Sequence, residues 1–422
     1  MQKQTSEGRA KAVMGLLERG AYAEAAATFD DAMQRVLPEA KLKEVWETLL
    51  AQAGRLQKIG EPHVSKRGAH ETVIIPLVFE HAPLDAHLTF DAEARIAGLH
   101  FLAPEAPYAL PAYADPARFV EREVVVNPGP WALPGTLTLP KGAPRVPAVV
   151  LVHGSGPNDR DETIGANKPF RDLAAGLASK GIAVLRYEKR TRVHGGKLAI
   201  ATSFTVDEET VDDALSAVAL LRGTSEIDDT KIFVAGHSLG GQLAPRIGKR
   251  DPRIAGLVLL AGNTRPLGPV MVEQLTYIFG LEGGPTPAQT AKLHAIEAAW
   301  QRIEAIRSGA ATATPGESLL GAPPSYWNDL NAYDGPAVAK ALPQRMFVMQ
   351  GGRDYQVTEP DFDAWRTALA GRTNVILKLY PKLNHALAAA AGQGKGTPAD
   401  YREPTHVDAE LVADLAAWML AK

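Results

Sequence analysis

The sequence contains no cysteine among its 422 residues. This absence excludes disulfides, zinc–thiolate sites and a thiol nucleophile. No apolar run approaches the ~20 residues of a membrane span, and residues 1–20 lack the apolar core of a signal peptide. We therefore expect a cytoplasmic protein, or a secreted or periplasmic one whose leader has been removed.

The chain also lacks a large excess of either positive or negative charge. The formal net charge is −3, so nothing favours nucleic acid or an anionic membrane as a partner. Hydrophobic residues make up 45% of the chain and charged residues 22%, a mixture typical of a globular protein with a full core. The length exceeds that of one ordinary domain, so we expect two domains, or one large domain with insertions.

The first part of the chain changes from a helical to a strand pattern. Residues 9–57 place apolar side chains at the 3–4 spacing of buried helix faces, and residues 70–102 alternate as strands do. We predict a small α+β domain over residues 1–105, followed by a proline- and alanine-rich linker at 106–118. The order of its elements resembles nuclear-transport-factor-like domains, in which helices pack on a curved sheet.

From residue 119 onward, short apolar strands alternate with amphipathic helices. This pattern predicts an α/β domain over residues 119–422, built on a doubly wound, mostly parallel sheet behind an antiparallel pair. The interval at about 265–340 is longer than a crossover needs and contains helical and aromatic-rich stretches. We interpret it as a helical cap over the mouth of the sheet; an oligomer contact is the alternative.

The sequence GHSLG, residues 236–240, places Ser238 between a buried-strand pattern and a helix pattern. This is the context that Gly-x-Ser-x-Gly requires of a nucleophile turn. The turn is so tight that side chains at Gly236 and Gly240 would meet neighbouring backbone, and the strained serine presents its hydroxyl to solvent. The N-terminus of the following helix favours developing negative charge. We predict that Ser238 is a nucleophile.

A serine hydroxyl needs a base, and the base needs a third group to hold it. Asp354 and His385 each follow a predicted strand at its carboxyl end, the edge at which Ser238 also lies. We therefore predict Asp354 as the acid and His385 as the base. Glu359 and Asp361 lie near Asp354 but have the pattern of helix-start residues. His406 is the rival base, although it precedes a helix and follows no strand.

The predicted oxyanion donors are backbone N–H groups of Leu239, after the nucleophile, and of Ser155, in the loop after the strand "AVVLVHG". The candidates for substrate contact are His153, His237, Tyr326 and Trp327. For the two cap aromatics, packing within the cap is the alternative. Residues 158–162 are interpreted as ordering the oxyanion loop, and the charged stretch 186–190 as an ionic network beside the site; direct contact with substrate is the alternative for both stretches.

Five segments together resemble the α/β-hydrolase superfamily: "VHGSGPNDRDE", "LRYEKRT", "GHSLGG", "QGGRDYQV" and "YPKLNHAL". The similarity spans residues 119–422 and is nearest to bacterial serine esterases related to dienelactone hydrolases and to prolyl-oligopeptidase-type catalytic domains. It implies the same triad and the same oxyanion amides. Dienelactone hydrolases proper use a cysteine nucleophile, which this chain does not have.

We therefore expect a carboxylesterase that cleaves small-molecule esters of small to medium acyl chains, without a metal or organic cofactor. A serine peptidase or amidase and an acyltransferase would use the same triad, so both remain alternatives. A binding protein that has kept the fold without catalysis is a third. Homo-oligomer formation and the role of the N-terminal domain are left open.

Overall fold

The computed structural model describes residues 5–67, 70–102, 104, 108–142 and 144–421. Within them the chain divides into two compact units, one of residues up to 107 together with 195–200, and one of residues 108–194 and 201–422. The predicted linker at 106–118 lies partly outside the described residues. From Tyr108 onward it belongs to the second unit: the Tyr108 hydroxyl donates to Asp172 at 2.6 Å and the Tyr113 hydroxyl to the Val407 carbonyl at 2.8 Å.

The first unit packs helices on one antiparallel sheet. Trp46 lies at the centre of its core, fully buried, with its ring 6.2 Å from Phe79 and 5.5 Å from Phe101. Strands pair in the order β1-β3-β4-β5, and β2 also pairs with β3. The elements are α1 (Ser6–Glu18), α2 (Tyr22–Ala26), α3 (Asp31–Val36), α4 (Glu39–Ala53), β1 (Leu56–Ile59), β2 (His63–Arg67), β3 (His70–Phe79), β4 (Pro83–Phe90), β5 (Ile96–Leu102) and α7 (Gly195–Ala199).

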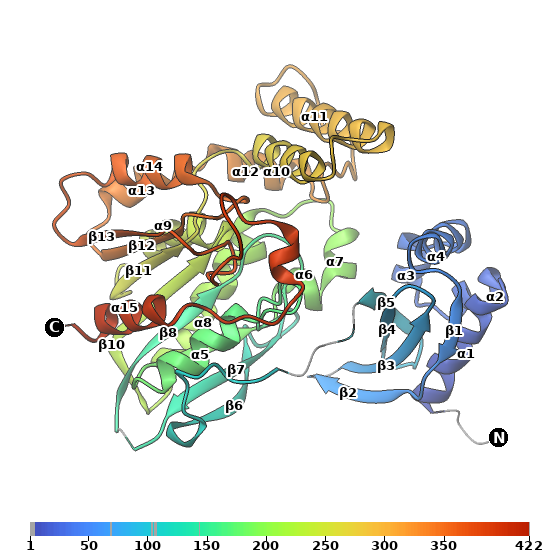
Figure 1. Ribbon diagram of the computed structural model, residues 1–422, viewed down its shortest axis with the longest axis horizontal. Coiled ribbons are helices and arrows are strands. Elements are labelled where there is room, and N and C mark those ends of the chain that lie inside the picture. The colour runs from blue at the N-terminus through green and yellow to red at the C-terminus, as the bar shows by residue number, and fades with distance from the viewer. Residues whose placement is uncertain (1–4, 68–69, 103, 105–107, 143, 422) are drawn as a thin grey trace. The chain divides into compact units, whose positions relative to one another are not determined.

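The second unit is built on one eight-stranded sheet in the order β13-β12-β11-β10-β8-β9-β7-β6 (Figure 1). Only β7 runs against the others, because it pairs antiparallel with both β6 and β9, while the remaining pairs are parallel. The strands are β6 (Phe119–Val126), β7 (Leu133–Pro140), β8 (Val146–Val152), β9 (Ala183–Tyr187), β10 (Ile227–His237), β11 (Gly256–Leu260), β12 (Arg345–Gly351) and β13 (Val375–Tyr380).

Helices cover both faces of this sheet. Along β8, Val150 faces one core and its neighbours Val149 and Leu151 the other, as the period of a strand requires. The helices α8 (Asp212–Arg222), α9 (Leu239–Arg250) and α14 (Glu359–Ala368) contribute to the first core, and α5 (Pro169–Ala178) and α15 (Ala409–Leu420) to the second. Short helical turns complete the unit: η1 (Pro116–Arg118), α6 (Arg190–Val193), η2 (Asp207–Val211) and η3 (Pro398–Tyr401).

The predicted insertion is helical. Between β11 and β12 lie α10 (Leu267–Leu281), α11 (Pro287–Arg307), α12 (Pro324–Ala332) and α13 (Gly335–Ala341) (Figure 1). On α10, Gln274 donates to the Gln356 carbonyl at 2.9 Å, and Tyr277 stacks on Tyr355 at 5.6 Å. This helix therefore packs against the loop that follows β12.

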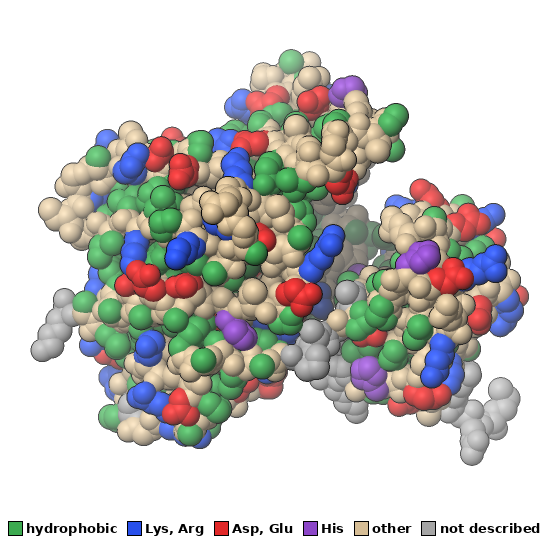
Figure 2. Space-filling model, viewed as in Figure 1, with side chains coloured by type: hydrophobic (Ala, Val, Ile, Leu, Met, Phe, Trp, Pro, Cys, Tyr) green, Lys and Arg blue, Asp and Glu red, His purple; other side chains and the backbone are tan. Residues whose placement is uncertain are grey.

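The surface seen in Figure 2 has no large patch of a single charge sign. On the face drawn in Figure 2, lysine and arginine side chains alternate with aspartate and glutamate, in keeping with a net charge of −3. Among the described residues, no helix is long and apolar enough to cross a membrane.

Candidate active site

Ser238 occupies the sharp turn between β10 and α9. Its backbone angles, φ 54° and ψ −118°, lie in a region that costs a non-glycine residue strain. The flanking glycines make the turn feasible: a β-carbon at Gly236 would lie 2.0 Å from the Gly240 carbonyl oxygen, and one at Gly240 would lie 2.3 Å from the Val152 oxygen. The local sequence therefore presents a strained serine at the carboxyl end of a central strand.

Asp354 and His385 meet at the same edge of the sheet. Asp354 follows β12, His385 follows β13, and the Asp354 Oδ2 lies 2.6 Å from the His385 Nδ1. The other carboxylate oxygen accepts the backbone N–H groups of Gln356 at 2.7 Å and Val357 at 3.0 Å. Both side chains are buried. The carboxylate is thereby fixed in orientation, and it fixes the imidazole in turn.

The turn at Ser238 is linked to the loop that carries His385 through His237. The His237 Nε2 lies 2.8 Å from the His385 carbonyl oxygen, and the two rings are 4.5 Å apart. Among the described residues, no group hydrogen-bonds the Ser238 hydroxyl, so the link from His385 Nε2 to Ser238 Oγ belongs to the proposal below. Apo enzymes often hold this hydrogen bond long, and substrate tightens it.

The two predicted oxyanion donors flank Ser238. Leu239 is the first residue of α9, where a helix leaves backbone N–H groups without an intrahelical acceptor. Ser155 lies in the exposed loop after β8. The preceding residue, Gly154, passes directly beside Ser238, since a β-carbon at Gly154 would lie 3.0 Å from the Ser238 Cβ. No described residue accepts a hydrogen bond from the Ser155 N–H.

Comparison with known proteins agrees with the fold described above. A model described as the alpha/beta hydrolase family matches residues 149–415, and one described as a protein of unknown function (DUF3887) matches residues 10–99. Esterase EstD of Thermotoga maritima is 40% identical over 380 residues, which cover 90% of this chain and 87% of that protein. This chain is an α/β hydrolase.

Solved structures similar to this α/β hydrolase include an esterase of the hyperthermophilic archaeon Pyrobaculum calidifontis and Est1E from Butyrivibrio proteoclasticus. The first is 18% identical with a TM-score of 0.45, covering 71% of this chain and 85% of its own. The second is 14% identical with a TM-score of 0.43, covering 71% of this chain and 99% of its own.

Glu162 is a residue of the hydrolase site whose partner the sequence did not reveal. It is buried, adopts a positive φ of 49°, and accepts the Gly154 N–H at 2.6 Å. The His237 Nδ1 lies 3.1 Å from the same carboxylate, as an ion pair rather than an aligned hydrogen bond. Burial alone would lower the pKa of His237 and raise that of Glu162, but the pKa of His237 is raised and that of Glu162 lowered, because their mutual attraction and the backbone groups of His385 and Gly154 together outweigh burial. Each group therefore favours the charged form of the other.

His153 lies within the core rather than at the surface of the hydrolase site. Its ring is 5.2 Å from both Phe170 and Tyr187, and burial lowers its pKa to about 4. The imidazole is therefore neutral near pH 7. Within the described part of the chain, its Nε2 has no hydrogen-bond partner.

The two predicted cap aromatics are buried on α12. Tyr326 packs on Phe204 at 5.8 Å and on Trp327 at 5.3 Å, and the Trp327 indole N–H donates to the Leu319 carbonyl at 2.6 Å. These contacts lie within the insertion and against Phe204, so substrate contact by either ring stays a prediction. Next to Asp354 lies a different aromatic set, in which Tyr355 stacks on Tyr277 and is 6.3 Å from Tyr401.

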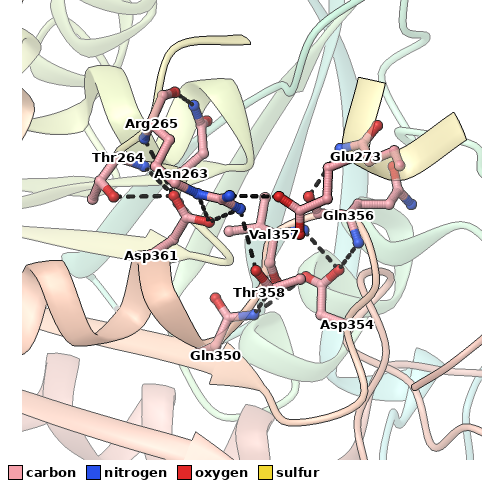
Figure 3. Close-up of polar contacts among 12 residues, drawn as sticks. Asn263, Thr264, Arg265, Glu273, Gln350, Asp354, Gln356, Val357, Thr358 and Asp361 are labelled. Carbon is pink, nitrogen blue, oxygen red and sulfur yellow. Dashed lines mark hydrogen bonds and ion pairs between the residues drawn. The ribbon is translucent and has the colours of Figure 1, made fainter. Parts of the chain in front are cut away.

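A polar network joins the loop that follows β12, which carries Asp354, to helix α10 of the insertion (Figure 3). The fully buried carboxylate of Asp361 accepts the Thr264 N–H at 2.8 Å and the Arg265 guanidinium at 2.9 and 3.1 Å. That guanidinium also reaches Thr358 at 3.2 Å and Glu273 on α10 at 2.5 Å. Asp361 is thus an anchor as well as a helix-start residue.

The alternative base, His406, has a different carboxylate partner. His406, the alternative base, pairs through Nδ1 with Asp172 at 3.1 Å, away from the Asp354–His385 pair. In the part of the chain that the structure describes, no three His, Asp or Glu side chains are grouped as metal ligands would be.

Proposed function

We propose that this α/β hydrolase cleaves carboxylic esters of small to medium acyl chains through Ser238, His385 and Asp354. The observation that carries the proposal is the 2.6 Å contact between Asp354 and His385 at the strand edge where Ser238 turns. The likeness to a protein named as an esterase, at 40% identity over most of both chains, supports the ester class.

In the proposed reaction His385 Nε2 takes the proton of Ser238, whose Oγ attacks the ester carbonyl. The amides of Ser155 and Leu239 hold the oxyanion of the tetrahedral intermediate. Protonated His385 then gives its proton to the leaving alkoxide, which departs as the alcohol. Water repeats the sequence on the acyl-enzyme, releasing the acid and restoring Ser238. Asp354 holds the imidazole tautomer and stabilises the imidazolium.

The test is turnover of a short-chain 4-nitrophenyl ester by Ser238→Ala and His385→Gln. Loss of a triad nucleophile typically removes a factor of ~10⁶ in kcat. His406→Gln is the matched control, because His406 also pairs with an aspartate. We expect near-complete loss in the first two variants and wild-type turnover in the third. Undiminished activity in Ser238→Ala would overturn the proposal.

The substrate class needs a second measurement. Steady-state rates on an ester and an amide of the same acyl group separate an esterase from a peptidase or amidase. Product analysis with added alcohol separates hydrolysis from acyl transfer. We expect a preference for the ester and for water, with rates falling as the acyl chain lengthens. A preference for the amide would contradict the ester assignment while leaving the triad intact.

A further inference from the structure

The carbonyl oxygen of Gly154 accepts hydrogen bonds from two side chains. The Lys189 Nζ donates at 2.7 Å and the Asn158 Nδ2 at 3.1 Å. Lys189 is 2% exposed, an unusual place for a lysine, and its ammonium also pairs with the buried Glu209 carboxylate at 2.7 Å. A buried positive charge is thus held against one particular peptide group.

That peptide group carries the proposed oxyanion donor. The Gly154 C=O and the Ser155 N–H belong to the same trans peptide, so they point in opposite directions. Holding the carbonyl towards Lys189 and Asn158 therefore aims the Ser155 N–H the opposite way. The ammonium also polarises the peptide, which makes that N–H a stronger donor.

The preceding peptide is fixed as well. The Gly154 N–H donates to Glu162 at 2.6 Å, and Glu162 is balanced by His237. Gly154 is therefore clamped on both sides by buried charged residues, each neutralised by its own partner. The main chain of Lys189 adds a further restraint, because its N–H donates to the Asn158 carbonyl at 3.1 Å.

We propose that Lys189 is a positioning residue for catalysis: it orients and polarises the Gly154–Ser155 peptide so that the Ser155 N–H receives the oxyanion. This inference rests on the proposed function. Lys189 acts through the peptide and contacts neither substrate nor Ser238. It stabilises the tetrahedral state and not the bound ester, so its removal should lower kcat and leave KM nearly unchanged.

The chain offers a matched control for the loss of a buried ion pair. Arg190 and Asp213 form the neighbouring pair, with nitrogen–oxygen distances of 2.8 and 2.6 Å, and both are buried. The double variant Lys189→Met with Glu209→Gln removes the first pair without leaving a lone charge. Arg190→Met with Asp213→Asn does the same for the second pair.

The measurements are kcat, KM and the Ki of a trifluoromethyl ketone, which forms an oxyanionic hemiketal with the serine. For the Lys189 pair we expect kcat to fall roughly tenfold to hundredfold, less than the ~10²–10³ for a donor lost outright. The Ki should rise by the same factor, while binding of the matched methyl ketone is unchanged. The Arg190 pair should lower melting temperature without changing the ratio of the two ketones.

Equal effects of the two double variants on kcat and on the ratio of the two ketone Ki values would overturn the inference. An unchanged trifluoromethyl ketone Ki in the Lys189→Met, Glu209→Gln variant would overturn it too.

If that double variant does not fold, Asn158→Leu provides the test, because Asn158 is less buried and donates to the same carbonyl. It should raise the same Ki several-fold, and an unchanged Ki would overturn the inference. Ser238→Ala in the same assay separates the two claims: if it remains active, the proposed function fails; if it is inactive while the Ki is unchanged, only the role of Lys189 fails.

Discussion

His237 holds the main chain of His385, with its Nε2 2.8 Å from that residue's carbonyl oxygen. The residue before the proposed nucleophile thus anchors the loop of the proposed base, and it is itself anchored by Glu162. A catalytic serine and histidine must be held to a fraction of an ångström. The His237–Glu162 pair supplies this restraint from within the core.

The His237–Glu162 pair predicts that the free energy of unfolding depends on pH. The pKa of His237 is raised on folding, so its contribution is complete below the ordinary histidine pKa and is lost as pH rises through the folded value. The pKa of Glu162 is lowered, so its contribution is lost on the acid side. In denaturant titrations, the stability advantage of wild type over His237→Gln with Glu162→Gln should therefore be largest at mildly acidic pH and smaller at pH 9. A difference independent of pH would contradict this.

His153 predicts the opposite trend. Its pKa of about 4 in the folded protein lies below the usual value, so the unfolded chain binds a proton first as pH falls. Between pH 7 and pH 5 this costs about 2 kcal/mol of the free energy of unfolding. His153→Phe should lose that much less on the same change of pH. The exposed His294→Phe is the control and should behave as wild type.

Asp361 predicts a coupling between the cap anchor and activity. Asp361→Asn weakens the charged hydrogen bonds between this side chain and Arg265. Because the site is buried, we expect the free energy of unfolding to fall by roughly 1–3 kcal/mol. Because Arg265 also holds Thr358, four residues beyond Asp354, kcat should fall as well. The control is Asp363→Asn on the same helix, whose exposed carboxylate pairs with Arg366. Equal stability and kcat in the two variants would show that the anchor is unimportant.

Two glycines with opposite surroundings predict opposite outcomes. Gly240→Ala places a β-carbon 2.3 Å from the Val152 backbone oxygen, so the turn cannot form, and we expect neither activity nor a wild-type melting transition. Gly280→Ala, on α10, meets nothing within 4 Å and should raise stability by about 0.5–1 kcal/mol. Circular dichroism melts of both variants check this, and a fully active Gly240→Ala enzyme would show that the turn is looser than described.

The sequence allowed much of the fold and of the proposed site to be foreseen where the physical requirement is local. Gly236 and Gly240 reveal the turn around Ser238 because no other residue fits there. The contact between Asp354 and His385 could be foreseen because each residue follows a strand pattern, and the carboxyl ends of parallel strands share one edge.

The buried ion pairs could not be foreseen in the same way. Lys189 lies directly before α6 and Glu209 lies in η2, so their contact depends on how the chain between these two elements folds back. No periodicity marks a charged residue as buried. The sequence indicates only that Glu162 belongs to a loop-ordering stretch, because its contact with His237 depends on the folded positions of both residues. Asp361 has the pattern of a helix start, and only its burial reveals that it holds Arg265.

The insertion leaves the sheet after β11 and returns at β12, two adjacent parallel strands joined in register from Gly256–Arg345 to Leu260–Met349. It therefore leaves from the carboxyl end of β11, the strand that separates β10, which leads into Ser238, from β12, which leads to Asp354, and it re-enters at the start of β12. A different segment placed between Leu260 and Arg345 would begin and end at the same two fixed positions of the sheet. The sequence of the insertion can accordingly be varied in a library while the strands that carry Ser238 and Asp354 are kept constant.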